Sequence, residues 1–496
     1  MADPPGLGSR CCTNPANSFF KFAYSFILSL HYACSLGTIS RSDSRVFRLK
    51  RQYGTNFCEF RGDCDIHGLV ELLFGYLRVV YLAASVQRVR VRAHISPALG
   101  TFGLLLCLNL LNYVDRYILP GEVSLIQREF HSTDQQMGLL TTALFVTYML
   151  VAPLTGWLGD RFSRKPLIIA GALLWSVATL GTAWVHDYWT LFVRHALVGV
   201  GEATFGIFAP AVLADFYPEK DRNRVLSIFY LAIPIGAALG YAAGGKMGSV
   251  FGWRAPFLYC AIPGLMVATL YMWIGREPAR GASDHIKPTV NRTTFRGLFS
   301  NPAYLTATFG LAALTFAMGG ISNWVPTFLH RFAGLSVGNA SLVVGGITVI
   351  DGIAGTLVGG WIAQRWLRTN HRALYLLSFW SVALTLPWGA LVFFGPPSWA
   401  VPSLFAAEFF LFLNTGPLNT AIINSVSAPV RATAIGLNLF IIHAFGDTFS
   451  PTIIGAISDR TQSLRLGLGF TLISLVVSCV ILWAGSRVAP LLEENP

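Results

Sequence analysis

Residues 156–165 read GWLGDRFSRK and connect two apolar segments of the chain. The acid in this loop, Asp160, can accept hydrogen bonds at a helix N-terminus and pair with a neighbouring arginine. The alternative is an ordinary positively charged membrane loop, because such loops are rich in lysine and arginine. We interpret the stretch as a cytoplasmic gate that closes one side of the molecule in one conformation. Its candidate residues are Gly156, Asp160, Arg161, Arg164 and Lys165.

Apolar segments of about 20 residues, the length that a membrane-spanning helix needs, precede and follow this loop. They lie at roughly 98–120, 137–157, 166–185, 189–216, 225–246 and 255–274, and then at 302–330, 338–363, 373–394, 400–427, 433–456 and 467–486. Of the 496 residues, 53% are hydrophobic and 12% are charged, whereas soluble proteins have about 25% charged residues. These features predict an all-α polytopic membrane protein with twelve transmembrane helices in two six-helix bundles.

A charged linker at 276–300 separates the two sets of six segments. The predicted domains are an N-terminal bundle at 97–275, this linker, a C-terminal bundle at 301–487 and a short tail at 488–496. Residues 1–96 mix basic residues, cysteines and polar tracts without sustained periodicity. We expect them to form a poorly structured or atypical N-terminal extension.

The orientation in the membrane follows from the charge of the loops. The linker and the loops after the second, fourth, eighth and tenth segments hold most of the lysine and arginine residues outside the extension. Loops of this kind stay on the cytoplasmic side. We therefore expect both ends of the helical core to be cytoplasmic, in a plasma (inner) membrane, and the net charge of +12 does not indicate nucleic-acid binding.

The first segment contains an adjacent acid and base within an apolar run, Asp115 and Arg116. Ionisable groups at membrane depth cost roughly 2.5–3.5 kcal/mol each, so they usually face a bundle interior or a cavity. The alternative is an interfacial pair in which Arg116 extends to the lipid headgroups. Adjacent residues point about 100° apart on a helix, so the two side chains need not face the same partner.

The fourth segment carries Arg194 and Glu202, two helical turns apart. Their directions differ by roughly 80°, so both could line one cavity. Arg194 can also be explained as a residue that extends to the membrane surface near a helix end. Glu202 has no such explanation, because residues 198–210 around it are otherwise apolar or small.

The second half holds fewer charged residues inside its segments, namely Asp351, Glu408, His443 and Asp447. His443 and Asp447 are four residues apart and share a helix face. Several asparagines, including Asn414, lie along the tenth segment. Hydrogen bonds between helices are the simpler explanation for polar groups of this kind, and contact with a substrate is the alternative.

The sequence gives no indication of a cofactor, a metal or an enzyme. Residues 240–246 fit the nucleotide-binding pattern G-x-x-x-x-G-K, but Met247 replaces the required Ser or Thr and the stretch lies in a predicted membrane helix. The cysteines do not have the spacing of a zinc site. No nucleophile and base stand out as a pair.

The loop GWLGDRFSRK resembles the signature of the major facilitator superfamily, G-x-L-x-D-R-x-G-R-R/K, with Ser163 at the usual glycine position. The loop at 360–368 is similar, with Gln364 in place of the acid. Arg194 with Gly199 and Gly201 resembles the R-x-x-x-G-x-G pattern of the same superfamily. The Gly/Pro-rich stretch at 234–245 is also similar to it. The resemblance implies the major facilitator fold, built from two repeated halves.

Three further pieces resemble the Spinster branch, which includes lysophospholipid and sphingosine-1-phosphate transporters. They are NYVDRY at 112–117, Arg194 with GVGEA at 199–203, and Gly446-Asp447 with Ser450-Pro451. The resemblance covers about residues 98–487 and, with the possible non-Met start codons, suggests a bacterial source. It implies a monomeric secondary active transporter in a lipid membrane that moves an amphipathic anionic or lysolipid-like molecule by alternating access, coupled to protons.

The same resemblance implies roles for individual residues. Asp115 and Glu202 would take part in proton coupling, and Arg116 and Arg194 would lie near an anionic head group. Further candidate substrate contacts are Tyr113, Asn414, His443 and Asp447. Two alternatives remain open at this stage: a symporter of sugar acids or other organic anions from the same superfamily, and a membrane sensor or scaffold that does not transport.

Overall fold

The structure is a computed structural model that describes residues 97–279, 282, 295–426 and 431–490. The chain divides into two units, Met1–Ile95 and Ser96–Pro496. The first unit, and with it nearly all of the predicted extension, lies outside the described residues, as do most of the linker and the end of the tail.

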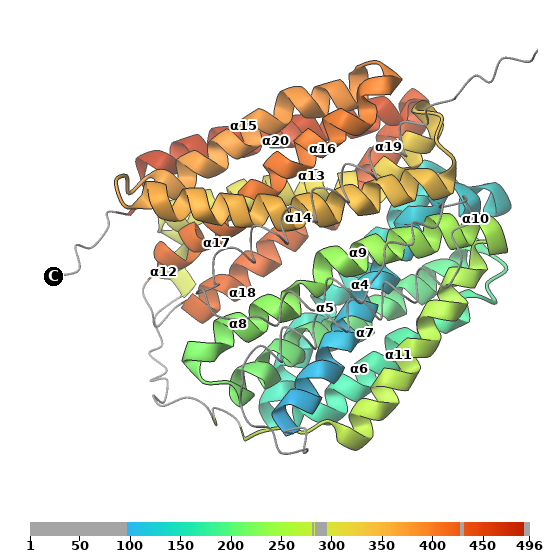
Figure 1. Cartoon of the computed structure of the whole chain (residues 1–496), viewed down its shortest axis with the longest axis horizontal. Helices are drawn as coiled ribbons and strands as arrows, with labels where there is room; N and C mark the ends of the chain where they lie inside the picture. Colours follow the sequence, from blue (N-terminus) through green and yellow to red (C-terminus); the bar gives the residue numbers. More distant parts are fainter. Residues whose placement is uncertain (1–96, 280–281, 283–294, 427–430, 491–496) are drawn as a thin grey trace, which may run out of the picture. The chain divides into compact units, whose positions relative to one another are not determined.

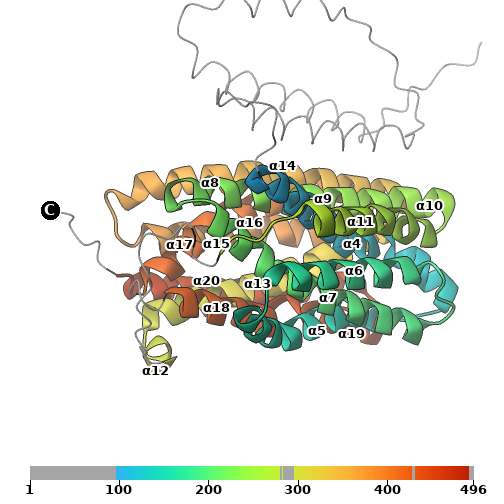
Figure 2. The ribbon, with the colours of Figure 1, turned by 90° about the horizontal axis from the view of Figure 1, so that it is seen from below.

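Twelve helical stretches in the described residues are long and apolar enough to cross a membrane, as the sequence predicts. Those of the first half are α4 (Pro97–Phe130), α5 (Asp134–Arg161), α6 (Arg164–Thr182), α7 (Tyr188–Phe216), the series α8 (Glu219–Tyr230), α9 (Ala232–Ala242), η1 (Ala243–Met247) and α10 (Gly248–Phe251), and α11 (Arg254–Ile274). Figures 1 and 2 show these helices lying side by side along a common direction, in blue to yellow-green.

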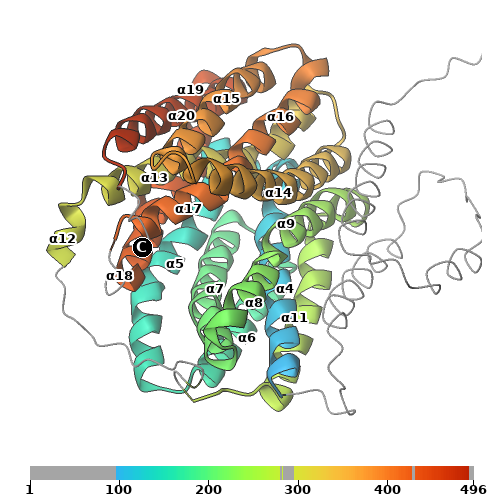
Figure 3. The ribbon, with the colours of Figure 1, turned by 60° about the vertical axis from the view of Figure 1, so that its left-hand side comes forward.

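The second half repeats this arrangement after the short helix α12 (Phe295–Phe299). Its spans are α13 (Pro302–Phe332), α14 (Val337–Leu367), α15 (Ala373–Phe394), the series η2 (Pro397–Trp399), α16 (Ala400–Leu413) and α17 (Thr415–Asn424), the series α18 (Arg431–Ile442), η4 (His443–Asp447) and α19 (Ser450–Thr461), and α20 (Leu464–Arg487). Figures 1 and 3 show this half, in yellow to red, beside the first.

Some helix boundaries differ from the prediction. The first span does not end at Pro120 but continues as one bent helix to Phe130, with a non-helical backbone at Glu122 (φ −133°, ψ 16°). Proline removes one hydrogen bond and displaces the preceding turn, and a membrane helix can absorb this change as a kink instead of ending. The predicted tenth span is interrupted at Asn414, and the predicted eleventh contains the π-helical segment η4.

Glycines spaced four apart let α9 and the following η1 pack closely on α4. A side chain at Gly236, Gly240 or Gly244 would overlap the backbone or the Cβ atoms of α4. Close contact of this kind replaces the hydrophobic driving force, which is absent between helices in lipid. It holds α4, the helix that carries Asp115 and Arg116, at a fixed distance from α9.

An interbundle seal, formed by Asp134, Arg331, Ser458 and Asp459, joins the two halves at one end of the bundle. Arg331 pairs with Asp134 at 2.8 Å, and the Ser458 hydroxyl donates to the other oxygen of Asp134 at 2.6 Å. The Asp459 carboxylate accepts from the backbone amides of Asp134 at 3.0 Å and Gln135 at 2.8 Å. Residues of the second half thus cap the N-terminus of α5 in the first half.

Hydroxyl groups add contacts between the halves. Thr142 donates to the carbonyl of Thr448 at 2.6 Å, and Ser341 donates to the carbonyl of Gly121 at 2.7 Å. Tyr241 donates to the carbonyl of Ser322 at 2.5 Å. These bonds are buried or partly buried and lie between the seal and the middle of the bundle.

Candidate functional site

Arg116 and Glu202 form an ion pair in the interior of the first half. Nε of Arg116 donates to Oε2 of Glu202 at 3.0 Å, and a terminal guanidinium nitrogen contacts the same oxygen. Glu202 is 1% exposed and Arg116 18%. The second carboxylate oxygen of Glu202 is buried without a hydrogen-bond partner. The pair therefore connects the middle of α4 to the middle of α7 and leaves one acceptor unused.

Aromatic rings surround the guanidinium of Arg116. Its central carbon lies 5.1 Å from the ring centroid of Tyr113, 5.4 Å from that of Phe145 and 5.9 Å from that of Tyr148. A cation within about 6 Å of an aromatic face is stabilised by the ring electrons. Phe145 and Tyr148 were not among the predicted residues, although their i, i+3 spacing places both on one face of α5.

The same rings bring the second half into the site. The imidazole of His443 stacks on Phe145, with centroids 5.7 Å apart and planes inclined by 22°. It also lies 6.0 Å from the ring of Tyr148. Nδ1 of His443 is 2.9 Å from a carboxylate oxygen of Asp447. Phe145 and Tyr148 thus stand between the Arg116–Glu202 pair of one half and the His443–Asp447 pair of the other.

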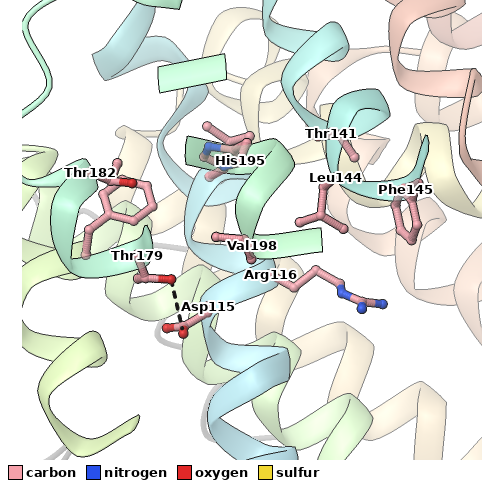
Figure 4. A pocket seen from close by; sticks show the side chains of 11 residues that line it. Asp115, Arg116, Thr141, Leu144, Phe145, Thr179, Thr182, His195 and Val198 are labelled. Carbon is pink, nitrogen blue, oxygen red and sulfur yellow. Dashed lines mark hydrogen bonds between the residues drawn. The ribbon is translucent and has the colours of Figure 1, made fainter. Parts of the chain in front are cut away.

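Asp115 faces a different partner from Arg116, as their offset on the helix predicts. The Thr179 hydroxyl on α6 donates to Asp115 at 3.4 Å, as Figure 4 shows. Asp115 is 7% exposed, and its other carboxylate oxygen is buried without a partner. A small cavity of about 20 Å³, room for about one water molecule, lies here. Its polar lining comes from Asp115, Arg116, Thr141, Thr179, Thr182 and His195.

The structure does not bring Arg194 and Asn414 to this cluster. Arg194 precedes Glu202 by eight residues, about 12 Å along a helix, and its guanidinium lies against Gly181 near the end of α6. Asn414 is 1% exposed. Its amide donates to the carbonyl of Leu411 at 2.9 Å and to Ser381 at 3.3 Å. The position of Arg194 fits the alternative of a residue near a helix end. The bond from Asn414 to Ser381 fits the alternative of a hydrogen bond between helices.

The predicted gate stretch is mostly helical: it forms the end of α5, through Arg161, and the start of α6, from Arg164, so only residues 162–163 connect the two helices. The side chains of Gly156 and Asp160 are outside the described part, and Arg161 lies over the Trp157 ring at 3.9 Å. A guanidinium nitrogen of Arg164 contacts Asp215, at the end of α7, at 2.5 Å. The loop residues Arg161, Arg164 and Lys165 therefore lie together at the end of the bundle opposite the interbundle seal.

Glu277, which follows α11, caps the N-terminus of α6 and was not predicted. It accepts from the amides of Arg164 at 2.8 Å and Lys165 at 2.9 Å, and from the Ser163 hydroxyl. Burial opposes its charged form, but these hydrogen bonds and the charge of Arg164 outweigh burial and lower the pKa of Glu277. Only the folded chain could reveal this residue, because Glu277 lies 112 residues after Lys165, one of the two residues whose amides it caps.

The sequence model of the protein family named Major Facilitator Superfamily matches residues 105–451. The chain therefore belongs to the Major Facilitator Superfamily: it is an integral multi-pass membrane transporter and not an enzyme. Within the superfamily it belongs to the spinster proteins. It is 34% identical over 385 residues to protein spinster homolog 1 of Xenopus tropicalis, and the match covers 72% of each chain. The human protein spinster homolog 1 is also 34% identical, over 383 residues and 72% of each chain.

Other similar proteins agree with this assignment. The sphingosine-1-phosphate transporter SPNS2 of Xenopus tropicalis is 32% identical over 377 residues, which are 73% of this chain and 74% of that one. The fold matches the crystal structure of a bacterial homolog to the human lysosomal transporter Spinster, with a TM-score of 0.72 and 21% identity over 80% of this chain and 98% of that chain. A D-xylose-proton symporter has the same fold, with a TM-score of 0.64 and 15% identity over 79% and 99% of the two chains.

Proposed function

We propose that the protein is a proton-coupled secondary active transporter that moves an amphipathic, lysolipid-like anion by alternating access. The observation that supports this proposal most directly is the buried Arg116–Glu202 pair within its aromatic cage. One relative is named a sphingosine-1-phosphate transporter, and that substrate has an anionic head group and a long apolar tail. A guanidinium among aromatic and aliphatic side chains suits both parts of such a substrate, since the guanidinium can pair with the anionic head group and the apolar side chains can contact the tail.

Proton coupling in this proposal depends on competition for Arg116. While Glu202 is ionised, its carboxylate holds the guanidinium. When Glu202 takes up a proton, Arg116 is released and can bind an anionic head group, since guanidinium pairs strongly with carboxylate and phosphate. The rings of Tyr113, Phe145 and Tyr148 stabilise the cation during the exchange. Asp115, beside Thr179 and the small cavity, is the second proton-coupling residue.

Apolar neighbours supply the other part of substrate recognition. Leu144, Phe145 and Val198 line the cavity beside Arg116. Each buried CH₂ group of a lipid tail contributes up to about 0.8 kcal/mol of binding free energy. A chain of carbon atoms attached to the head group would therefore increase affinity and would distinguish a lysolipid from a sugar acid.

The conformation in this proposal is inward-facing, in a plasma (inner) membrane, with both ends of the helical core in the cytoplasm. The loop charges support a position of the interbundle seal on the side away from the cytoplasm. The gate residues Arg161, Arg164 and Lys165 lie at the opposite end, where the central site would open. The related bacterial Spinster homolog was also crystallised in an inward-facing conformation. We propose that one chain is the working unit.

A transport assay in proteoliposomes tests the proposal. Purified protein is reconstituted, a pH gradient is imposed, and movement of sphingosine-1-phosphate is compared with movement of a hexuronate. The expected result is proton-driven movement of the lipid anion, which Glu202→Gln and Asp115→Asn abolish. The matched control is Asn419→Ala, because Asn419 is exposed and donates only within its own helix.

The same assay includes the results that contradict the proposal. Movement of the hexuronate without the lipid would identify an organic-anion symporter instead. Lipid movement that persists without a pH gradient and in both acid variants would exclude proton coupling through Glu202 and Asp115. No movement of either compound by correctly folded protein would favour a sensor or scaffold.

A further inference from the structure

The second half contains a buried pair of acids that the site described above does not use. Asp351 lies midway along α14 and is 0% exposed. Glu408 lies midway along the span that α16 and α17 form and is 6% exposed. The Thr348 hydroxyl donates to Glu408 at 3.1 Å, and Asp351 follows Thr348 by three residues, on the same face of α14. The two carboxylates interact electrostatically.

In the part of the chain that the structure describes, no lysine, arginine or histidine pairs with these acids. Both oxygens of Asp351 are buried without a hydrogen-bond partner, and neither acid forms an ion pair within the described residues. The other ionisable groups that interact with Glu408 are Tyr117 of α4 and Tyr241 of α9.

The internal repeat allows the acid of the fourth span to be compared with the acid of the tenth. The fourth span carries Glu202 and the tenth, its counterpart in the repeat, carries Glu408, each near the middle of its helix. Glu202 is paired with Arg116, but the neighbour of Glu408 is another acid. Two neighbouring carboxylates in a membrane interior cannot both remain ionised, so a bound proton must replace the missing arginine.

We propose that Asp351 and Glu408 form a second proton-binding site, in the second half, which loads and releases one proton during the transport cycle. This inference rests on the proposed proton-coupled function and extends it to the number of protons that are moved. The site would hold a single proton on one or the other of the two carboxylates, and Thr348 would donate to the oxygen of Glu408 that remains free of it.

The position of the pair couples it to movement of the halves. Gly352 is next to Asp351 and lies where α14 contacts α16 of the second half and α9 of the first half. A Cβ atom at Gly352 would lie 3.3 Å from Cβ of Pro234 on α9 and 3.8 Å from the Phe412 ring. Relative movement of α14 and α9 therefore changes the surroundings of Asp351. Such a change is what allows a buried acid to bind a proton in one conformation and lose it in the other.

Chemical labelling tests the site independently of transport. Dicyclohexylcarbodiimide reacts with protonated carboxylic acids in apolar surroundings, and mass spectrometry locates the product. In the wild-type protein we expect labelling of Glu408 or Asp351 that falls about tenfold for each pH unit above its midpoint, equally in sodium and potassium chloride. In Asp351→Asn the midpoint at Glu408 should move to lower pH, because the second negative charge is gone.

Coupled fluxes test whether this proton is used. Protons and sphingosine-1-phosphate are measured together in proteoliposomes, and Glu408→Gln and Asp351→Asn should each move one proton fewer per lipid than the wild type. The double variant should lose no more than either single variant, because the pair shares one proton. The matched control is Ser403→Ala. Ser403 also lies on α16 and is buried, and its hydroxyl has no hydrogen-bond partner among the described residues. This variant should keep the wild-type ratio.

Several results would overturn the inference. These are labelling that does not change with pH, protection by sodium but not by potassium, and an unchanged proton ratio in variants that still transport. If wild-type transport shows no proton movement, the proposed function fails instead, and labelling still decides whether the pair titrates. If Glu408→Gln does not fold, labelling of the wild type and the flux ratio of Asp351→Asn decide the question.

Discussion

Arg116 and Glu202 differ in how they tolerate the loss of their partner. A buried carboxylate can become neutral by binding a proton, whereas a guanidinium keeps its charge under all ordinary conditions. Glu202 is almost fully buried and Arg116 is partly exposed. The pair is therefore asymmetric, and this asymmetry is what lets the proposed cycle use protonation of the acid as its switch.

We predict that Glu202→Gln destabilises the protein by about 3–5 kcal/mol, the usual cost of leaving a buried charge unpaired. Arg116→Gln should cost less, because the remaining Glu202 can bind a proton. The double variant should cost less than the sum of the two single variants. Thermal unfolding in detergent at neutral pH, arranged as a double-mutant cycle, measures these differences.

The ion pair between Arg254 and Glu129 is the matched control for this cycle. It spans α11 and α4 of the same half at 2.6 Å, but its side chains are 31% and 41% exposed. Exposed pairs contribute about 0–1 kcal/mol. Additive effects at Arg116 and Glu202, or an equally large effect at the control pair, would contradict the prediction.

The sequence predicted the charged members of the site better than its aromatic members. Asp115, Arg116 and Glu202 stand out because a charge inside an apolar segment is costly unless something nearby stabilises it. Phe145 and Tyr148 do not stand out, since aromatic residues are ordinary in membrane helices. Their role depends on α5 facing both Arg116 and His443, which only the packing of the helices determines.

At the scale of helices, α6 depends on a residue outside itself for its N-terminal cap. Ser163 is the N-cap residue, but its side chain makes no capping hydrogen bond to the helix. Its hydroxyl donates to Glu277 instead, and Glu277 receives the first two amides. The start of α6 and the residue after α11 are thus held together on the side of the predicted gate.

We predict that Glu277→Gln lowers the stability of the protein by about 1 kcal/mol at neutral pH, the usual contribution of a helix cap. Because the pKa of Glu277 is lowered in the folded protein, its contribution is complete above the unfolded value of about 4.3. It is lost as the pH falls through the lower folded value. The difference between variant and wild type should therefore shrink in acid, as measured by thermal unfolding across pH.

Ser163→Ala is a graded control for this effect, because it removes one hydrogen bond to Glu277 and leaves the two amides in place. It should cost less than Glu277→Gln at neutral pH. A Glu277→Gln protein as stable as the wild type at every pH would show that another group caps α6.

Hydropathy predicted the number and order of the spans, because every apolar stretch must reach across the same lipid thickness. It did not predict where helices bend or break. Pro120 looks like a helix end in the sequence, yet α4 continues to Phe130, and its later residues contact the other half. Asn414 and the segment η4 interrupt spans that remain apolar enough to cross the membrane, so hydropathy alone gives no sign of the interruptions.

For the molecule as a whole, the interbundle seal joins the two halves at one end of the bundle. Arg331 contacts both Asp134 and Gln127 of the other half, and the alternating access that we propose requires that these contacts break. The stability of the seal therefore sets part of the balance between the two conformations.

We predict that Arg331→Gln shifts this balance toward opening at the seal. A cysteine placed at Ser341, which is 0% exposed and bonded across the halves, should then react faster with a membrane-impermeant maleimide. A shift of about 1.4 kcal/mol corresponds to tenfold faster labelling. Mass spectrometry of the peptide that contains position 341 measures the rate.

The control is Arg254→Gln, which removes an ion pair on the same side of the protein but within one half. It should leave the labelling rate at position 341 unchanged. An equal increase of the labelling rate by both variants would indicate a general loss of stability. An unchanged rate in Arg331→Gln would mean that the seal does not control opening.

The hydroxyl bonds between the halves have a consequence for how reversibly the protein can open. Thr142 and Ser341 donate to backbone carbonyls of the opposite half. A serine or threonine in a helix can turn and donate to a carbonyl one turn back in its own helix. When the halves separate, these two donors need not be left without an acceptor in lipid. The closed side is held by bonds that can be exchanged instead of lost, which keeps repeated opening inexpensive over many cycles.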